Sequence, residues 1–123
     1  MQQLANYVKG QSDYICNGNG DYNAQALASP EGWVSYGTSC TPGNAPTSNN
    51  ATGFSLLPAG YYVAGNSVQY VGQYTYLWRA NNNGTVNLWP FGMNYKSALF
   101  QGGGGLSENV TKAKGFSVRC VHN

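Results

Sequence analysis

Few residues in this chain of 123 could carry acid–base chemistry, and they lie far apart in the sequence. They are four carboxylates and one imidazole: Asp13, Asp21, Glu31, Glu108 and His122. General acid–base catalysis needs two titratable groups within a few ångströms of each other, whereas these fall in expected turns, at an expected helix start or beside the terminus. No G-x-S-x-G segment supplies a nucleophile for His122. We therefore expect no catalytic residues and a protein that is not an enzyme.

Metal and phosphate sites also lack their usual residue patterns. Cys16, Cys40 and Cys120 form no C-x-x-C pair, and His122 is the only histidine, which excludes a four-ligand zinc site. Four acidic residues are too few for a tight calcium site, although a weak one built from Asn and backbone oxygens stays open. No Lys-Ser/Thr follows the glycine run at 102–105, so we expect a flexible connector there. The sequence predicts no metal and no cofactor.

The odd number of cysteines leaves at least one without a partner inside the chain. One disulfide between distant positions is expected in an oxidising compartment, and three buried thiols are the alternative. The residues alone leave both arrangements open.

Composition restricts the class of protein further. Only 8% of the residues are charged, while the chain holds ten Tyr, three Trp and 17 Gly, which excludes a coiled coil, a helical bundle and a disordered acidic tail. Six scattered cations and a net charge of +2 form no basic stripe, so nucleic acid is not an expected partner. No apolar stretch of about 18 residues and no signal-peptide pattern is present, so we expect no membrane insertion and no targeting signal in this chain.

The hydropathy pattern predicts a single α+β domain over residues 1–123. Leu4, Tyr7 and Val8 have helical spacing and Gly10 follows them, which predicts a helix over 2–9. A second short helix is expected over 21–28 with Asp21 as its cap. The stretch 33–50 has no period and is expected to form a long irregular loop.

The rest of the chain is typical of a mostly antiparallel sheet. Strands are expected over 54–57, 61–64, 67–71, 74–79, 86–95 and 116–121. Within 89–96 the alternation puts Trp89, Phe91, Met93 and Tyr95 on one side, and Pro90, Gly92, Asn94 and Lys96 on the other. Pro90 has no N–H for a central strand, so we expect a sheet edge or a bulge there.

Asparagine is unusually common in this β-rich half, at Asn81, Asn82, Asn83, Asn87 and Asn94. Asn disfavours strands, so such a neutral, hydrogen-bonding and aromatic surface is typical of recognition loops. An ordinary Asn-rich surface is the alternative. Trp and Tyr rings could form a platform for sugars, although a chain with few aliphatic residues also needs them in its core.

Two long segments carry a family resemblance. Residues 49–61, NNATGFSLLPAGY, and 115–121, GFSVRCV, resemble the central and C-terminal motifs of the Fibrobacter succinogenes major paralogous domain. The patterns at 14–16, 26–28, 32–33 and 77–78 extend the resemblance over nearly the whole chain. It implies a C-type-lectin-like fold in a surface-exposed or secreted protein of a gut bacterium, with a binding role. Members usually carry a Cys-Pro-x-Gly-Trp segment before the first helix that this sequence does not contain, which leaves Cys16 or Cys40 as the partner that Cys120 could take.

Some relatives resemble targets of diversity-generating retroelements, which rewrite adenines in a C-terminal variable region. Residues 77–121 fit such a region, although Lys96 and Gln101 do not arise from Asn codons by single adenine changes. The resemblance and the alternation together predict a face that binds a protein or glycan on a bacterial or phage surface. Its expected residues are Arg79, Asn81, Asn83, Asn87, Pro90, Gly92, Lys96, Ser97, Leu99 and Gln101. The alternatives are a carbohydrate-binding or structural surface module of a gut bacterium without diversification, and less readily a hydrolase.

Overall fold

The computed structural model describes residues 1–65, 67–80, 86–102 and 114–120, and for residues 80 and 86–89 the backbone alone. Its helices are α1 (Gln2–Lys9) and α2 (Ala24–Leu27), with the 3-10 turns η1 (Ser12–Tyr14) and η2 (Pro46–Ser48). Its strands are β1 (Tyr61–Val63), β2 (Val68–Gln69), β3 (Tyr74–Ala80), β4 (Val86–Asn94), β5 (Gln101–Gly102) and β6 (Lys114–Gly115). The predicted α+β class is confirmed. Among the described helices, none is long and apolar enough to cross a bilayer.

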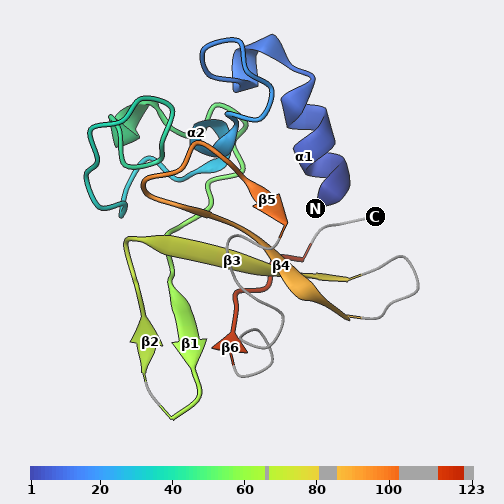
Figure 1. Cartoon of the computed structure of the whole chain (residues 1–123), viewed down its shortest axis with the longest axis vertical. Helices are drawn as coiled ribbons and strands as arrows, with labels where there is room; N and C mark the ends of the chain where they lie inside the picture. Colours follow the sequence, from blue (N-terminus) through green and yellow to red (C-terminus); the bar gives the residue numbers. More distant parts are fainter. Residues whose placement is uncertain (66, 81–85, 103–113, 121–123) are drawn as a thin grey trace.

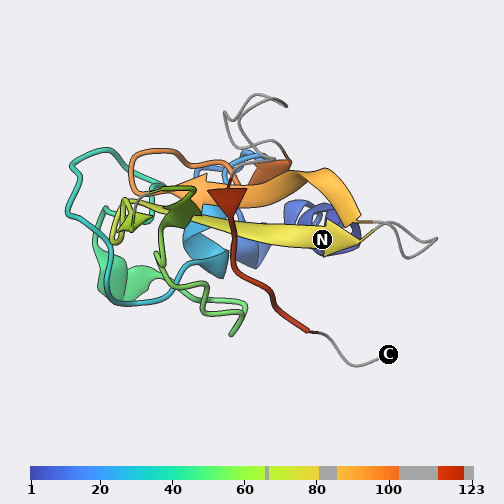
Figure 2. The same ribbon diagram turned by 90° about the horizontal axis from the view of Figure 1, so that it is seen from below.

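The strands form two small antiparallel sheets, in the orders β2-β1-β6 and β3-β4-β5. Figure 1 shows the long β3–β4 hairpin in the middle, with α1 and α2 at one end and the β1, β2 and β6 strands at the other. Two parallel bridges, Gly60 with Thr75 and Leu77 with Ser117, connect the two sheets. Figure 2, turned by 90°, shows β3 and β4 running together past α1. The hairpin therefore links the two ends of the molecule.

Helix α1 has the predicted bounds, because its local pattern is sufficient to define it. Ala5 and Val8 are buried, and the N–H of Gly10 donates to the carbonyl of Tyr7 at the helix end. Tyr7 is 60% exposed, so it does not belong to the buried face as the spacing had predicted.

Helix α2 is shorter than predicted, and Asp21 does not cap it. The helix begins at Ala24 with Asn23 in the cap position, and no side chain caps its first turn. The carboxylate of Asp21 instead lies 2.6 Å from the Nζ atom of Lys9. The cause is a tight turn, in which the N–H of Asp21 donates to Oδ1 of Asn19 and that of Tyr22 to the carbonyl of Asn19.

Two predicted strands are wrong, and two short strands, β5 and β6, lie outside the predicted ranges. Residues 54–57 form only the bridge between Ala28 and Leu56, because Ser55 has a φ of 53°, which an extended strand does not allow. The described part of 116–121 forms only the bridge of Ser117 with Leu77, while the strand pairing lies just before it in β6. The two-residue β5 carries no pattern long enough to predict it.

Strand β4 is the central strand of its sheet, so the edge position considered for Pro90 is wrong and the bulge is confirmed. Leu77 pairs with Phe91 and Arg79 pairs with Asn87, so the register shifts between these two pairs. Pro90 lies in this interruption, where no ladder N–H is needed. Opposite this bulge, in β3, the N–H of Trp78 donates to the carbonyl oxygen of Ser117 at 3.1 Å instead of to β4.

The main hydrophobic core lies between the helices and one face of the β3–β4 hairpin. Phe91 and Met93 are each 2% exposed and Tyr95 packs against the same core, which confirms the predicted inward side of this strand. Trp89 was predicted on that side, but its side chain lies outside the description. The buried core residues are Ala5, Val8, Ala24, Leu27, Ala28, Trp33, Leu56, Leu77, Phe91, Met93 and Phe100.

Candidate functional site

The structure divides the ten predicted binding residues into different environments. Asn81 and Asn83 lie outside the described residues, as do Glu108 and His122, and of Asn87 only the backbone in β4 is described. Lys96 and Gln101 are exposed, whereas Arg79, Ser97 and Leu99 are half-buried. The predicted residues therefore do not form one continuous exposed face within the described chain.

Pro90 and Gly92 were predicted to point outward, and this is wrong because both are buried. A Cβ atom at Gly92 would collide with the ring of Tyr76 and lie 2.5 Å from the carbonyl oxygen of Thr75. The second face of β4 is thus covered as closely as the first. Alternation along the strand could not reveal this, because Gly and Pro carry no hydropathy signal of burial.

Two of the predicted residues, Leu99 and Gln101, line a groove of about 340 Å³ between α1 and β5. The rest of its wall, on α1 and in the turn before α2, was not predicted from the sequence. The groove is lined by Gln2, Ala5, Asn6, Lys9, Asp21, Asn23, Phe91, Leu99, Phe100, Gln101 and Gly102. Residues from both ends of the sequence therefore meet in one depression.

The helix wall of the groove follows from helical spacing. Gln2, Asn6 and Lys9 are separated by four and three positions, so they lie along one side of α1. The Nε2 atom of Gln2 donates to Oδ1 of Asn6 at 2.9 Å. This run of polar residues beside the buried Ala5 is the signal that could have identified the wall from the sequence.

The opposite wall is held in place by strand pairing and by one buried side chain. Gln101 and Gly102 pair with Gly92 and Phe91 of the central strand. Just before them, the N–H of Phe100 donates to Oδ1 of Asn23 at 3.1 Å. Asn23 is 4% exposed, so this hydrogen bond is protected from water and joins the turn before α2 to the start of β5.

The groove presents mainly neutral hydrogen-bonding groups over an apolar floor. Lys9 and Asp21 form an ion pair at 2.6 Å with side chains 55% and 63% exposed, so their charges largely cancel. Phe91 and Phe100 form the floor, with ring centroids 5.2 Å apart. Among the described residues that line the groove, Asp21 is the only carboxylate.

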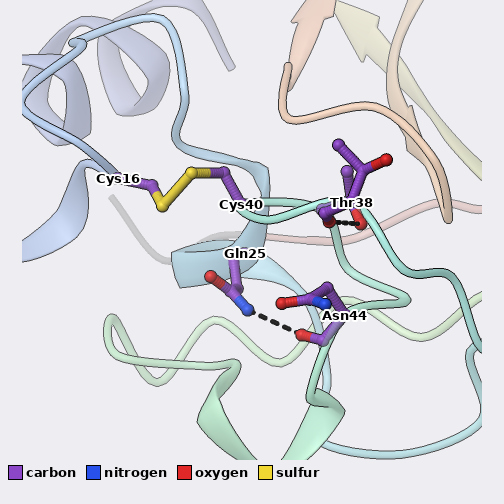
Figure 3. The surroundings of a disulfide bond; sticks show 6 residues. Cys16, Gln25, Thr38, Cys40 and Asn44 are labelled. Atoms are coloured by element: carbon purple, nitrogen blue, oxygen red, sulfur yellow. Dashed lines mark hydrogen bonds between the residues drawn. A yellow bond between two sulfur atoms is a disulfide. The ribbon is translucent and has the colours of Figure 1, made fainter.

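A disulfide joins Cys16 to Cys40 beside the second helix (Figure 3), with Cα atoms 5.5 Å apart. Next to it, Nε2 of Gln25 in α2 donates to the carbonyl oxygen of Asn44 at 2.9 Å. Cys120 is exposed and unpaired, so the pairing of Cys120 with Cys16 or Cys40 is wrong. The disulfide attaches the irregular loop 33–50 to the helical end of the molecule.

The described residues contain no group of three or more His, Cys, Asp or Glu side chains that could hold a metal ion.

Comparison with known proteins gives a match at the level of a family. Residues 1–122 match the family described as the Fibrobacter succinogenes major domain. No curated protein and no solved structure matches the chain. The matched range contains both walls of the groove and all three cysteines.

Proposed function

The chain belongs to the Fibrobacter succinogenes major domain family, and from this membership we propose that it is a ligand-binding module without catalytic activity. Its ligand is a protein or a glycan, and it binds in the groove between α1 and β5. The observation that supports this proposal is the groove's lining of amide side chains above two packed phenylalanine rings.

The lining suits recognition because its polar groups can both donate and accept hydrogen bonds. The amides of Gln2, Asn6 and Gln101 each carry a donor and an acceptor and stay neutral at all physiological pH values. An apolar floor with a few convergent polar groups is the usual composition of a binding pocket. A hydrolase would need a second carboxylate near Asp21, and the described lining residues include none, which supports binding over the alternative of hydrolysis.

The finer parts of the proposal rest on the family resemblance. We propose that the chain has a C-type-lectin-like fold and is displayed on the surface of a bacterium or phage, or secreted. The supporting segments are 49–61 and 115–121, which resemble that family's central and C-terminal motifs. The non-diversified carbohydrate-binding module remains the competing proposal, since neutral amides also suit sugar hydroxyl groups.

Diversification by a retroelement is part of the same proposal. Because Pro90 and Gly92 are buried, it concerns Ser97 and Leu99 among the four positions at which relatives tend to have Asn. Ser97 and Leu99 are half-buried in the loop before β5, and the Leu99 side chain borders the groove. Changes there could alter the ligand without disturbing the core. The test is genomic: a near-copy of the segment encoding 77–121 beside a reverse transcriptase, differing mainly at adenines. Differences spread over all four bases would contradict it.

Binding in the groove can be tested with two matched substitutions on α1. Asn6 lines the groove and Gln3 does not, although both are exposed residues of the same helix. The wild type, Asn6→Trp and Gln3→Trp would be compared on a glycan array and a displayed-peptide library. We expect Asn6→Trp to abolish the wild-type hits and Gln3→Trp to keep them, with equal melting temperatures. Equal binding by all three would place the ligand elsewhere.

A further inference from the structure

A second surface feature lies where β1, β2 and β6 meet the β3 strand, at the end of the molecule opposite α1 and α2 (Figure 1). We call it the tyrosine cluster. It consists of Tyr61, Tyr70, Tyr74, Tyr76, Phe116 and Lys114. The residues predicted to bind ligand do not include any of these six.

Tyr61 is the centre of the cluster. Its ring stacks on that of Tyr70 with centroids 5.3 Å apart and an interplanar angle of 27°. It forms T-shaped contacts with the rings of Tyr74 and Tyr76, with centroids 6.4 Å and 5.6 Å away. The Nζ atom of Lys114 lies 4.0 Å from the centroid of the same ring, a cation–π contact.

The cluster has a buried base and an exposed rim. Tyr76 and Phe116 are 2% and 8% exposed, so they belong to the interior. Tyr70 is 48% exposed, and Tyr61, Tyr74 and Lys114 are half-buried. A stacked phenol pair and an ammonium group therefore reach the surface together on a rigid aromatic support.

The Tyr70 ring is held by a strained backbone conformation. Tyr70 has a φ of 60°, a conformation that only Gly, Asn and Asp adopt readily. Gly60 allows the close approach that sets Tyr61 against it, since a Cβ at Gly60 would collide with the carbonyl oxygen of Gln69 and lie 2.9 Å from the nitrogen of Val71. Strain of this kind is frequently retained where a side chain is needed for function.

The charge of Lys114 is not balanced by a carboxylate in the described chain. The ion pair of Lys9 with Asp21 is the one salt bridge among the described residues, and both of its residues line the groove. Burial lowers the pKa of Lys114 from its ordinary value, while the neighbouring Tyr70 raises it to a smaller extent. An anionic group bound at Lys114 would compensate for this partial desolvation.

We propose that the tyrosine cluster binds an acidic saccharide. The sugar carboxylate accepts hydrogen bonds from the Lys114 ammonium, and the apolar face of the pyranose ring packs on the exposed Tyr70 ring. The phenol groups of Tyr61 and Tyr74, which can donate and accept, bind the sugar hydroxyls. Hydroxyl-rich rings with a carboxylate satisfy the aromatic, hydroxyl and cationic groups together, which an apolar or a basic ligand does not.

The test uses pairs of probes in which a methyl ester removes the charge of the carboxylate. Isothermal titration calorimetry would compare trigalacturonate and sialyllactose, each with its own methyl ester. We expect the wild type to bind at least one acidic sugar, and its neutral counterpart at least tenfold more weakly. Binding of neither acid at millimolar concentration, or equal binding of the neutral forms, would overturn the proposal.

Three variants locate the site on the protein. Lys114→Gln is expected to lose at least tenfold in affinity and Lys114→Arg to retain most of it, because the charge is kept. Tyr70→Asn is expected to lose binding without a lower melting temperature, since Asn accepts a positive φ. Arg119→Gln removes a cation that packs on Phe54 away from the cluster, and should bind as the wild type. Unchanged affinity in Lys114→Gln and Tyr70→Asn would overturn the assignment.

This surface is separate from the groove, so the two proposals can fail independently. Asn6→Trp should leave acidic-sugar binding unchanged, and Lys114→Gln should leave the groove ligand unaffected. Loss of acidic-sugar binding in Asn6→Trp would show that the sugar occupies the groove and not the tyrosine cluster.

Discussion

Asn23 and Phe100 are 77 positions apart in the sequence, yet Oδ1 of Asn23 accepts the backbone N–H of Phe100. Asn23 precedes α2 and Phe100 precedes β5, so this hydrogen bond joins the helical end of the molecule to the sheet, beside the one from the N–H of Ala24 to the carbonyl of Ala98. Both residues also line the groove that we propose as the binding site.

Replacing Asn23 with Ala should destabilise the protein by about 1–3 kcal/mol, because the buried N–H of Phe100 then has no acceptor. Urea unfolding measures the change in the free energy of unfolding. The matched control is Asn6→Ala, an exposed residue of the same groove, which should change stability by less than about 0.5 kcal/mol. Equal effects of the two substitutions would contradict the role assigned to Asn23.

The burial of Gly92 predicts that the central strand does not tolerate a side chain there. Gly92→Ala should lower stability by about 1–3 kcal/mol, because the methyl group meets Tyr76 and the Thr75 carbonyl. Gly102→Ala is the control, since its Cβ would lie 3.5 Å from the nearest atom, in ordinary contact with Phe91. A Gly92→Ala variant with the wild-type melting temperature would support the outward-facing position instead.

The cysteine arrangement predicts a single reactive thiol. Alkylation of the native protein should add one label, at Cys120, and three after reduction in denaturant. Replacing both Cys16 and Cys40 with Ser should cost about 3 kcal/mol, because the disulfide closes a loop of sequence separation 24. Peptide mapping that finds Cys120 in a disulfide within the chain would refute this pairing.

The tyrosine cluster predicts a late phase in the alkaline titration of the phenols. Burial raises the pKa of Tyr76 and that of Tyr61 above the ordinary value of 10.0, with neighbouring tyrosines contributing. Absorbance at about 295 nm should therefore rise at higher pH in the native protein than in the urea-unfolded chain. Tyr76→Phe should remove part of this late phase. Coincident native and unfolded titrations would argue against a buried cluster.

The same pKa shifts determine how stability depends on pH. Above pH 10.0 an unfolded tyrosine loses its proton while the folded Tyr61 and Tyr76 keep theirs, so the native state binds more protons. The contribution of these two residues is thus fully present below pH 10.0 and is lost as the pH rises through their folded pKa values. Urea midpoints measured across this range should fall, and less steeply in Tyr76→Phe.

The sequence predicts those elements that depend on residues close together in the chain. The bounds of α1 follow from the spacing of its apolar residues and from Gly10, and the bulge at Pro90 follows from its missing N–H. The α+β class and the family follow from patterns and motifs that extend over most of the chain. Each of these depends on a residue and its near neighbours, which is the range over which propensity acts.

Other features were decided by contacts between distant segments. Asp21 was predicted to cap a helix, but it lies in a tight turn and its carboxylate pairs with Lys9. Asn23 occupies the cap position of α2, and its side chain accepts a hydrogen bond from Phe100 instead of capping the helix. Alternation in β4 identified Phe91 and Met93 as inward, since it reports the more apolar face of a strand. It could not report that the opposite face is also covered, because that depends on which other segments fold against it.

The groove and the disulfide depend on tertiary structure for the same reason. Helix α1 and strand β5 lie near opposite ends of the sequence, and no local pattern specifies that they face each other. Three cysteines permit three different pairings, and only the position of the loop 33–50 beside α2 brings Cys40 to Cys16. The sequence by itself determined helix α1, the strands over 61–63, 74–80 and 86–94, and the family to which the chain belongs. Packing decided which side chains share a surface, because many weak contacts between remote residues set that arrangement together.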